Sequence, residues 1–171
     1  SLERNEVDLA LVSVLPEHLD IDGLDLMPNK LYLIGKPELG KKKRMRISDL
    51  EKNVLIYREK GSATRAAMEH FMTGNEIPTS KSIELTSNEA VKQAVMAGLG
   101  YSVMPLIGLR NELKNQQLEI VDVKGLPIIT HWNLVWLRDK KLSPVTEAYL
   151  KHVEEAKDDI INEHFRWHEA Y

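Results

Sequence analysis

The stretch that decides the fold is "TSNEAVKQAVMAGLGYSVMP", residues 86–105. Thr86 and Glu89 have the T-x-x-E spacing of a capping box, which predicts the start of a helix. Apolar residues then recur at helical spacing, and Gly98 is a natural C-terminal stop. The short apolar run "YSVMP" follows as a predicted strand. A capped helix that leads directly into a buried strand is typical of an α/β unit.

Helices and strands alternate on the N-terminal side of this stretch as well. The run "VLIY" is predicted as a short buried strand, "TRAAMEHFMTG" as a helix that stops at Gly74, and "SIELT" as a further strand. Nearer the N-terminus, "EVDLALV" and "LDLMPNKLYLIG" are predicted as extended runs. Pro28 in the second run indicates an edge or a bend rather than a central position.

The C-terminal side begins with two predicted strands, "LEIVDV" and "THWNLVWLR". Ser143 is then the expected N-cap of a final helix, with Pro144 at the first helical position. The expected buried stripe of this helix consists of Val145, Tyr149, Val153, Ala156 and Ile160. The whole order is β-β-α-β-α-β-α-β-β-β-α. Alternation in the middle predicts a right-handed, mostly parallel α/β unit from about residue 35 to residue 130, flanked by two pieces of another domain.

The composition of the 171 residues, 43% hydrophobic and 29% charged, is that of an ordinary globular protein. A net charge of −3 argues against a direct grip on nucleic acid, and the basic run "KKKRMR" (Lys41–Arg46) is predicted to be a solvated loop. The absence of cysteine excludes disulfides and thiolate chemistry. No apolar run has the length of a membrane span, and the charged start "SLERNEVD" is no signal peptide, so a cytoplasmic location is expected.

The turn "GSATR" (Gly61–Arg65) is the most informative candidate site. It lacks the G-x-x-x-x-G-K-[ST] pattern of a phosphate loop and the G-x-S-x-G pattern of a nucleophile elbow. Two roles stay open from the residues alone. The hydroxyls of Ser62 and Thr64 can cap the following helix, or they can bind an anion together with free backbone N–H groups at the helix N-terminus.

Taken together, the blocks "NEVDLALV", "SDL", "GSATR", "TSNEAVKQAVMAGLGYSVMP" and "LSPVTEAYLKHV" occur in an order and at spacings that define a family. The chain resembles the effector-binding domain of LysR-type transcriptional regulators over nearly its whole length. The most specific part of the resemblance is the pattern S-x-E-A-V-K-x-x-V-x-x-G-L-G-x-x-x-x-P from Ser87 to Pro105.

The resemblance implies an α/β fold like that of type 2 periplasmic binding proteins, with two subdomains, two crossover strands and a ligand cleft. It assigns residues 1–33 to part of subdomain I and the first crossover, and residues 34–130 to subdomain II. Residues 131–171 are then the second crossover and the C-terminal helix of subdomain I. The family's winged helix-turn-helix, its linker helix and the first strand and helix of subdomain I have no counterpart here, so the first subdomain is expected to be incomplete.

The resemblance also favours ligand binding over plain capping at the "GSATR" turn, because effectors of the family commonly meet this turn. A residue in the segment Thr86–Asn88 can both cap its helix and face the ligand. The residues expected to bind the effector are Ser13, Gly61, Ser62, Ala63, Thr64, Asn88 and His131. No catalytic residue, metal ligand or cofactor is expected, and the histidines at 164 and 168 are predicted to lie in a charged tail.

The function implied by the resemblance is that of a ligand-sensing and oligomerising domain of a LysR-type regulator. A small metabolite, for which the turn favours an anion, would control a homodimer or tetramer that meets DNA only through a domain absent from this chain; no membrane partner is expected. One alternative is a solute-binding receptor of the same fold that serves transport. An enzyme is another, because fold does not fix function, but it requires an acid, base or nucleophile set that the sequence does not display.

Overall fold

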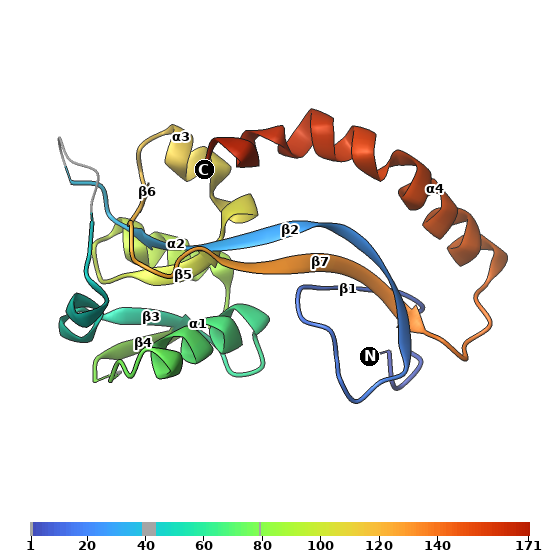
Figure 1. Cartoon of the computed structure of the whole chain (residues 1–171), viewed down its shortest axis with the longest axis horizontal. Coiled ribbons are helices and arrows are strands. Elements are labelled where there is room, and N and C mark those ends of the chain that lie inside the picture. Colours follow the sequence, from blue (N-terminus) through green and yellow to red (C-terminus); the bar gives the residue numbers. More distant parts are fainter. Residues whose placement is uncertain (1, 39–43, 79) are drawn as a thin grey trace. The chain divides into compact units, whose positions relative to one another are not determined.

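The structure is a computed structural model that describes residues 2–38, 44–78 and 80–171 (Figure 1). The chain divides into two compact units. Unit 1 combines the residues up to Asn29 with Thr130–Tyr171, and unit 2 is Lys30–Ile129. Strands β2 (Ile21–Gly35) and β7 (Ile128–Leu137) contribute residues to both units.

The elements of unit 2 follow the order that the sequence predicts. They are η1 (Ile47–Lys52), β3 (Leu55–Arg58), α1 (Ala63–Gly74), β4 (Ser82–Leu85), α2 (Asn88–Met96), β5 (Ser102–Pro105), η2 (Leu106–Leu109), α3 (Arg110–Lys114) and β6 (Glu119–Ile120). Strands β3 and β4 pair in parallel, and Tyr101, just before β5, forms a parallel bridge to Leu55.

The pairing inside the unit predicted from about residue 35 to residue 130 is parallel, but it does not extend to β2, which lies almost wholly before residue 35. Both β5 and β6 pair with β2 in antiparallel register, for example Leu33 opposite Val103. The strands joined by helical crossovers, β3–α1–β4–α2–β5, are the ones to which the right-handed crossover rule applies. Strand β2 comes before these crossovers, so the rule does not fix its direction.

Two apolar clusters fill unit 2, one on each face of the β3–β4 pair. Alternate residues of a strand point to opposite faces. Leu55 and Tyr57 therefore pack in one cluster with Met68 of α1, whereas Ile56 packs in the other with Val91 of α2. Full burial of an aliphatic side chain contributes about 1.5–3 kcal/mol, so these two clusters hold the two helices against the strands.

Helix α2 starts one residue later than the capping-box spacing predicts. Its N-cap is Ser87, whose Oγ accepts a hydrogen bond from the Ala90 N–H at 3.1 Å. The prediction of Thr86 as the cap was therefore wrong. Counted from Ser87, Glu89 is the second helical residue and not the third, so it does not complete a capping box. Its carboxylate accepts a hydrogen bond from the Gln93 side chain instead. The adjacent hydroxyl residue, Ser87, has the geometry to reach the third helical N–H.

The predicted stop of α2 at Gly98 is confirmed. Gly98 has φ +80°, the Gly98 N–H bonds the Val95 carbonyl at 2.8 Å, and the Leu99 N–H bonds the Ala94 carbonyl at 3.1 Å. These two bonds form a Schellman motif, which favours glycine at the left-handed position. The motif turns the chain directly towards β5.

Gly100 lets the backbone before β5 approach the backbone before β3. A Cβ atom at Gly100 would lie 2.3 Å from the Val54 carbonyl oxygen. The neighbouring Tyr101 N–H donates to that same oxygen at 2.9 Å. A larger residue at this position would therefore displace the β3–β5 contact.

Unit 1 contains β1 (Ala10–Val12), which pairs with β7 in antiparallel register, and α4 (Pro144–Ile160). Shorter turns, η3 (Ile161–Phe165) and η4 (Arg166–Ala170), follow α4. The predicted start of α4 is confirmed, since Ser143 Oγ accepts from the Thr146 N–H at 3.2 Å. No helix in the described part of the chain has the length and hydrophobicity needed to cross a membrane.

The predicted buried stripe of α4 is wrong. Val145 is 79% exposed, Tyr149 53% and Ile160 41%, while Val153 and Ala156 are half-buried. The buried residue of α4 is instead Thr146, whose hydroxyl donates to Asp8 at 3.0 Å. Helical spacing predicts an apolar face, but burial of that face depends on a neighbouring element.

Candidate functional site

The carboxyl ends of β3 and β4 lie at one edge of their parallel pair, because Arg58 is opposite Leu85 in the register. Helices α1 and α2 begin shortly after these ends, so both helix N-termini come to this edge (Figure 1). The structure thereby brings the turn of residues 61–64 and Asn88 to one side of unit 2. Five of the seven predicted site residues are gathered here.

The turn before α1 leaves its polar groups available. Gly61 is exposed with φ +93°, and the Ser62 N–H donates to the Glu59 carbonyl at 3.2 Å. Ser62 is the N-cap of α1, but its side chain makes no capping hydrogen bond. The Ser62 hydroxyl therefore does not cap α1, in contrast to one of the two roles left open by the sequence. The N–H groups of Ala63 and Thr64 belong to the first turn, where no acceptor exists within the helix.

Arg58 links the two helix starts and was not among the predicted site residues. Its guanidinium donates to both carboxylate oxygens of Glu59, at 2.7 and 2.8 Å, and its Nη1 donates to Asn88 Oδ1. The bonds from Arg58 to Glu59 are the main reason that the pKa of the Glu59 carboxyl is lowered to about 2. A signal was present in the sequence, since an Arg–Glu pair directly follows the buried run "LIY".

Arg65, the last residue of the "GSATR" turn, has a structural role because its side chain bonds residues of α1 and β4. It donates to Glu69 at 2.7 Å and to Glu84, and its Nη1 also reaches the Arg58 carbonyl at 2.9 Å. Its guanidinium carbon lies 5.7 Å from the centre of the Tyr57 ring. The bonds to Glu69 and Glu84 raise the pKa of Arg65, so it stays charged while it holds α1 against β4.

The electrostatics of the edge favour an anion at α1 more than at α2. The first turn of α1 has no acidic residue, whereas the first turn of α2 contains Glu89. A helix N-terminus attracts negative charge with about 0.3–1 kcal/mol at an exposed position. Glu89 already occupies that role at α2. The positive end of α1 is thus the better place for a negatively charged group.

The two remaining predicted residues belong to unit 1. Ser13 is half-buried and directly follows β1, and His131 lies on β7, the strand with which β1 pairs. His131 Nδ1 lies 3.0 Å from an Asp25 carboxylate oxygen, and both side chains are exposed. These contacts do not place Ser13 or His131 with the five residues of unit 2.

Metal chemistry has no support among the described residues, which contain no group of three or more candidate ligands. The two histidines near the C-terminus differ from a ligand pair in their contacts. His168 is buried, and its ring packs edge-on against Trp167 with centroids 4.4 Å apart. His164 is exposed, with its Nε2 3.9 Å from the neighbouring Glu163.

This fold, an α/β arrangement like that of type 2 periplasmic binding proteins, is shared with solved regulatory domains of transcription factors. The family described as "LysR substrate binding domain" matches residues 1–158. The chain belongs to this family, and the resemblance seen in the sequence is confirmed.

Curated relatives agree with this assignment. The chain is 37% identical over 154 residues to the RuBisCO operon transcriptional regulator of Allochromatium vinosum, covering 89% of this chain and 51% of the relative. It is 36% identical over 154 residues to the transcriptional activator CmpR of Synechocystis, again covering 89% and 51%. The chain thus spans about half the length of these relatives.

Solved structures show the same fold. The CcmR regulatory domain of Synechocystis, solved in complex with 2-PG, has a TM-score of 0.82 and 32% identity, with 91% of this chain and 76% of that chain covered. The effector-binding domain of QuiR, solved with shikimate, has a TM-score of 0.76 at 19% identity, with 92% and 75% covered. The second likeness concerns the fold alone.

Proposed function

We propose that this chain is the ligand-sensing and oligomerising domain of a LysR-type transcriptional regulator. It would bind a small anionic metabolite, and the protein would meet DNA through another domain. The proposal rests on one observation: the N-termini of α1 and α2 lie at the same edge of unit 2, in a chain that belongs to this family. The cytoplasm is the compartment we propose, since a transcriptional regulator acts where the DNA is.

The ligand would bind first at the turn before α1. The N–H groups of Ala63 and Thr64 and the hydroxyls of Ser62 and Thr64 would donate hydrogen bonds to an anionic group. Bonds of this kind to a charged partner contribute about 1.5–3 kcal/mol each. Asn88 would add a contact from α2 while its side-chain oxygen stays bonded to Arg58. Ser13 and His131 of unit 1 stay predictions of effector contact.

Control of transcription would follow from a shift between two conformations of the assembled regulator. A ligand moves such an equilibrium only by the difference in its affinity for the two states. We propose a homodimer or tetramer as the assembly, as the family resemblance implies. A transport receptor is less well supported, because the curated relatives are transcriptional regulators. The same relatives support a binding module rather than an enzyme.

The experiment is a calorimetric titration of the intact protein with 2-PG, the ligand of the CcmR structure. The double variant Ser62→Ala/Thr64→Ala should bind about ten-fold or more weakly, since one lost bond to a charged group already corresponds to this factor. Thr73→Ala, which removes a hydroxyl from the far end of α1, is the matched control and should bind as the wild type does.

Unchanged affinity in the folded double variant would contradict the assignment of the turn. If the wild type does not bind 2-PG, a thermal-shift screen of phosphorylated and carboxylated metabolites supplies the ligand for the same titration. A ligand that binds the folded state raises its stability, which makes this screen direct.

A further inference from the structure

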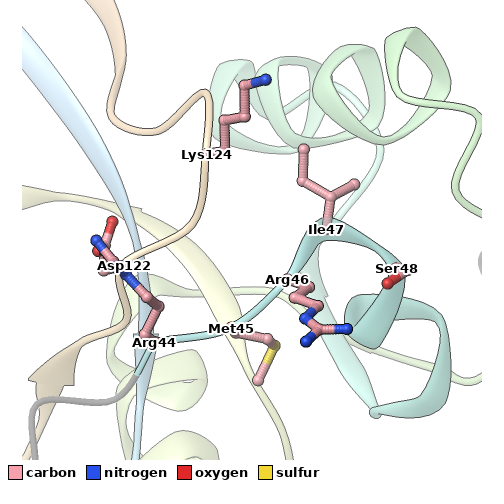
Figure 2. A pocket seen from close by; sticks show the side chains of 7 residues that line it. All are labelled: Arg44, Met45, Arg46, Ile47, Ser48, Asp122 and Lys124. Carbon is pink, nitrogen blue, oxygen red and sulfur yellow. The ribbon is translucent and has the colours of Figure 1, made fainter.

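A second feature of unit 2, separate in sequence from the candidate site, is a pocket of about 550 Å³ (Figure 2). Figure 2 shows its two walls. One is the segment of residues 44–48, and the other is the segment that carries Asp122 and Lys124. A volume of this size lies within the range of about 300–1,000 Å³ that is usual for small-molecule sites.

The two walls are joined at one end. The Met45 N–H donates to the Asp122 carbonyl at 2.9 Å, and Arg44 Nε donates to the Asp122 carboxylate at 2.8 Å. The backbone bond fixes the spacing of the walls there. The ion pair neutralises Arg44, so Arg44 and Asp122 together add no net charge to the pocket.

The wall that carries Lys124 is a tight turn with a defined backbone. The Leu126 N–H bonds the Val123 carbonyl at 3.1 Å, and Gly125 has φ +92°. A Cβ atom at Gly125 would lie 3.1 Å from the Phe71 ring of α1. Because the turn rests on this buried ring, the backbone that carries Lys124 has a defined position beside the pocket.

Two cations of the pocket have no counter-ion within the described residues. Arg46 and Lys124 are exposed, and neither forms an ion pair there, whereas Arg44 does. They come from opposite walls, and in Figure 2 their charged ends point away from each other. The pocket therefore carries local positive charge on a chain whose net charge is −3. The basic run 41–46 was predicted only as a solvated loop, and its residues 41–43 lie outside the described residues.

The pocket also has an apolar side. Met45 and Ile47 are half-buried and pack against the larger apolar cluster of unit 2, and both line the pocket. Ser48 adds a hydroxyl to the same wall. A ligand with an apolar body and a doubly charged anionic group would match both sides of this surface.

We propose that this pocket is a second binding site, for a phosphorylated small molecule. The exposed side chains of Arg46 and Lys124 would turn towards the space between the walls and contact the phosphate from opposite sides. The Ser48 hydroxyl would donate a hydrogen bond to a phosphate oxygen, and the ligand's apolar part would lie on Ile47. A phosphate group matches two separated cations better than a single carboxylate does, because it carries more charge and more acceptor oxygens. No residue of the turn before α1 takes part.

The test uses phenyl phosphate, which has a dianionic group and an apolar ring, in calorimetric titrations of the intact protein. The titrations are made in the Ser62→Ala/Thr64→Ala background, in which binding at the turn before α1 is weakened. We expect binding that weakens with salt and that falls about ten-fold in Lys124→Met and in Arg46→Met, as for one lost bond to a charged group. Lys114→Met, an exposed lysine of α3, is the control and should change nothing.

Three results would overturn this proposal. The first is equal affinity for phenyl phosphate in Lys124→Met, Arg46→Met and the parent, with folding checked by circular dichroism. The second is no binding by the parent protein. The third is loss of binding to random-sequence duplex DNA in both variants without any binding of phenyl phosphate, which would assign the basic surface to DNA phosphates instead. None of these outcomes depends on whether the turn before α1 binds an effector.

Discussion

Unit 2 and unit 1 use the same kinds of sequence pattern but differ in how much of each pattern is buried. In unit 2, alternate residues of β3 are buried on both faces because α1 and α2 cover both sides. In unit 1, Leu11 of β1 is 57% exposed and Val145 of α4 is 79% exposed. Among the described residues, the buried apolar side chains of unit 1 are Leu2, Leu134 and Val135.

The difference shows what a periodic pattern can predict. An apolar stripe identifies the type of element and the face that would be buried, but a second element must cover that face before burial stabilises anything. In unit 2 the helices that cover the strands, α1 and α2, follow β3 and β4 directly in the sequence. The contrast therefore predicts that equal substitutions have unequal effects in the two units.

The largest effect is expected from Leu33→Ala on β2. Leu33 is fully buried in unit 2, and removal of such a side chain costs about 2–5 kcal/mol, including the cavity that it leaves. The same change at Leu11, which is exposed on β1, should alter the free energy of unfolding by about 0.5 kcal/mol or less. Urea unfolding of the two variants measures the difference, and equal losses would break the comparison.

Gly100→Ala should have the next largest effect. The added Cβ would meet the Val54 carbonyl oxygen at 2.3 Å, and overpacking of this kind costs about 1–3 kcal/mol. Gly108→Ala is the control, because a Cβ at Gly108 has no atom within 4 Å. Thermal unfolding compares the two variants. A Gly100→Ala protein as stable as Gly108→Ala would show that the β3–β5 approach is not close.

The two helix starts of unit 2 give a smaller and sharper contrast. Ser87→Ala removes a capping bond to the Ala90 N–H and should cost about 1 kcal/mol. Ser62→Ala should cost clearly less, because the Ser62 side chain makes no capping bond. Chemical denaturation resolves a difference of this size. If both variants lost the same stability, Ser62 would be a structural cap and its hydroxyl would not be available to a ligand.

The smallest effect concerns pH. The folded pKa of Glu59, about 2, lies below its ordinary value of 4.5, so its pairing with Arg58 stabilises the fold fully above pH 4.5. That contribution is lost as the pH falls from 4.5 towards 2. Glu59→Gln should therefore flatten the decline in stability over this interval, and Glu51→Gln, at an exposed residue of η1, is the control. An unchanged decline in Glu59→Gln would contradict the pairing.

Much of the fold was predictable because its signals are local. The stop at Gly98, the N-cap at Ser143 and the alternation of strands and helices need only neighbouring residues. The link between Arg58 and Asn88 was not predictable in the same way, since these residues are 30 positions apart and meet only once β3 and β4 pair. The direction of β2 and the exposure of α4 likewise depend on which elements lie next to them.

The candidate site was predicted in part. The turn of residues 61–64 and Asn88 come to one edge of unit 2, as expected from parallel strands that each lead into a helix. Sequence reasoning left capping and ligand binding open at Ser62, because both use the same hydroxyl. In the structure the Ser62 side chain makes no capping bond, and ligand binding by its hydroxyl stays a prediction.

The central claim is that the start of α1 binds a small-molecule effector. The most direct measurement follows the backbone amide resonances of the isotope-labelled protein while the ligand from the calorimetric titration is added. We predict that the amides of Ala63, Thr64 and Asn88 shift, with an affinity equal to the calorimetric one. Saturating ligand that leaves these three amides unmoved, while others shift, would contradict the account.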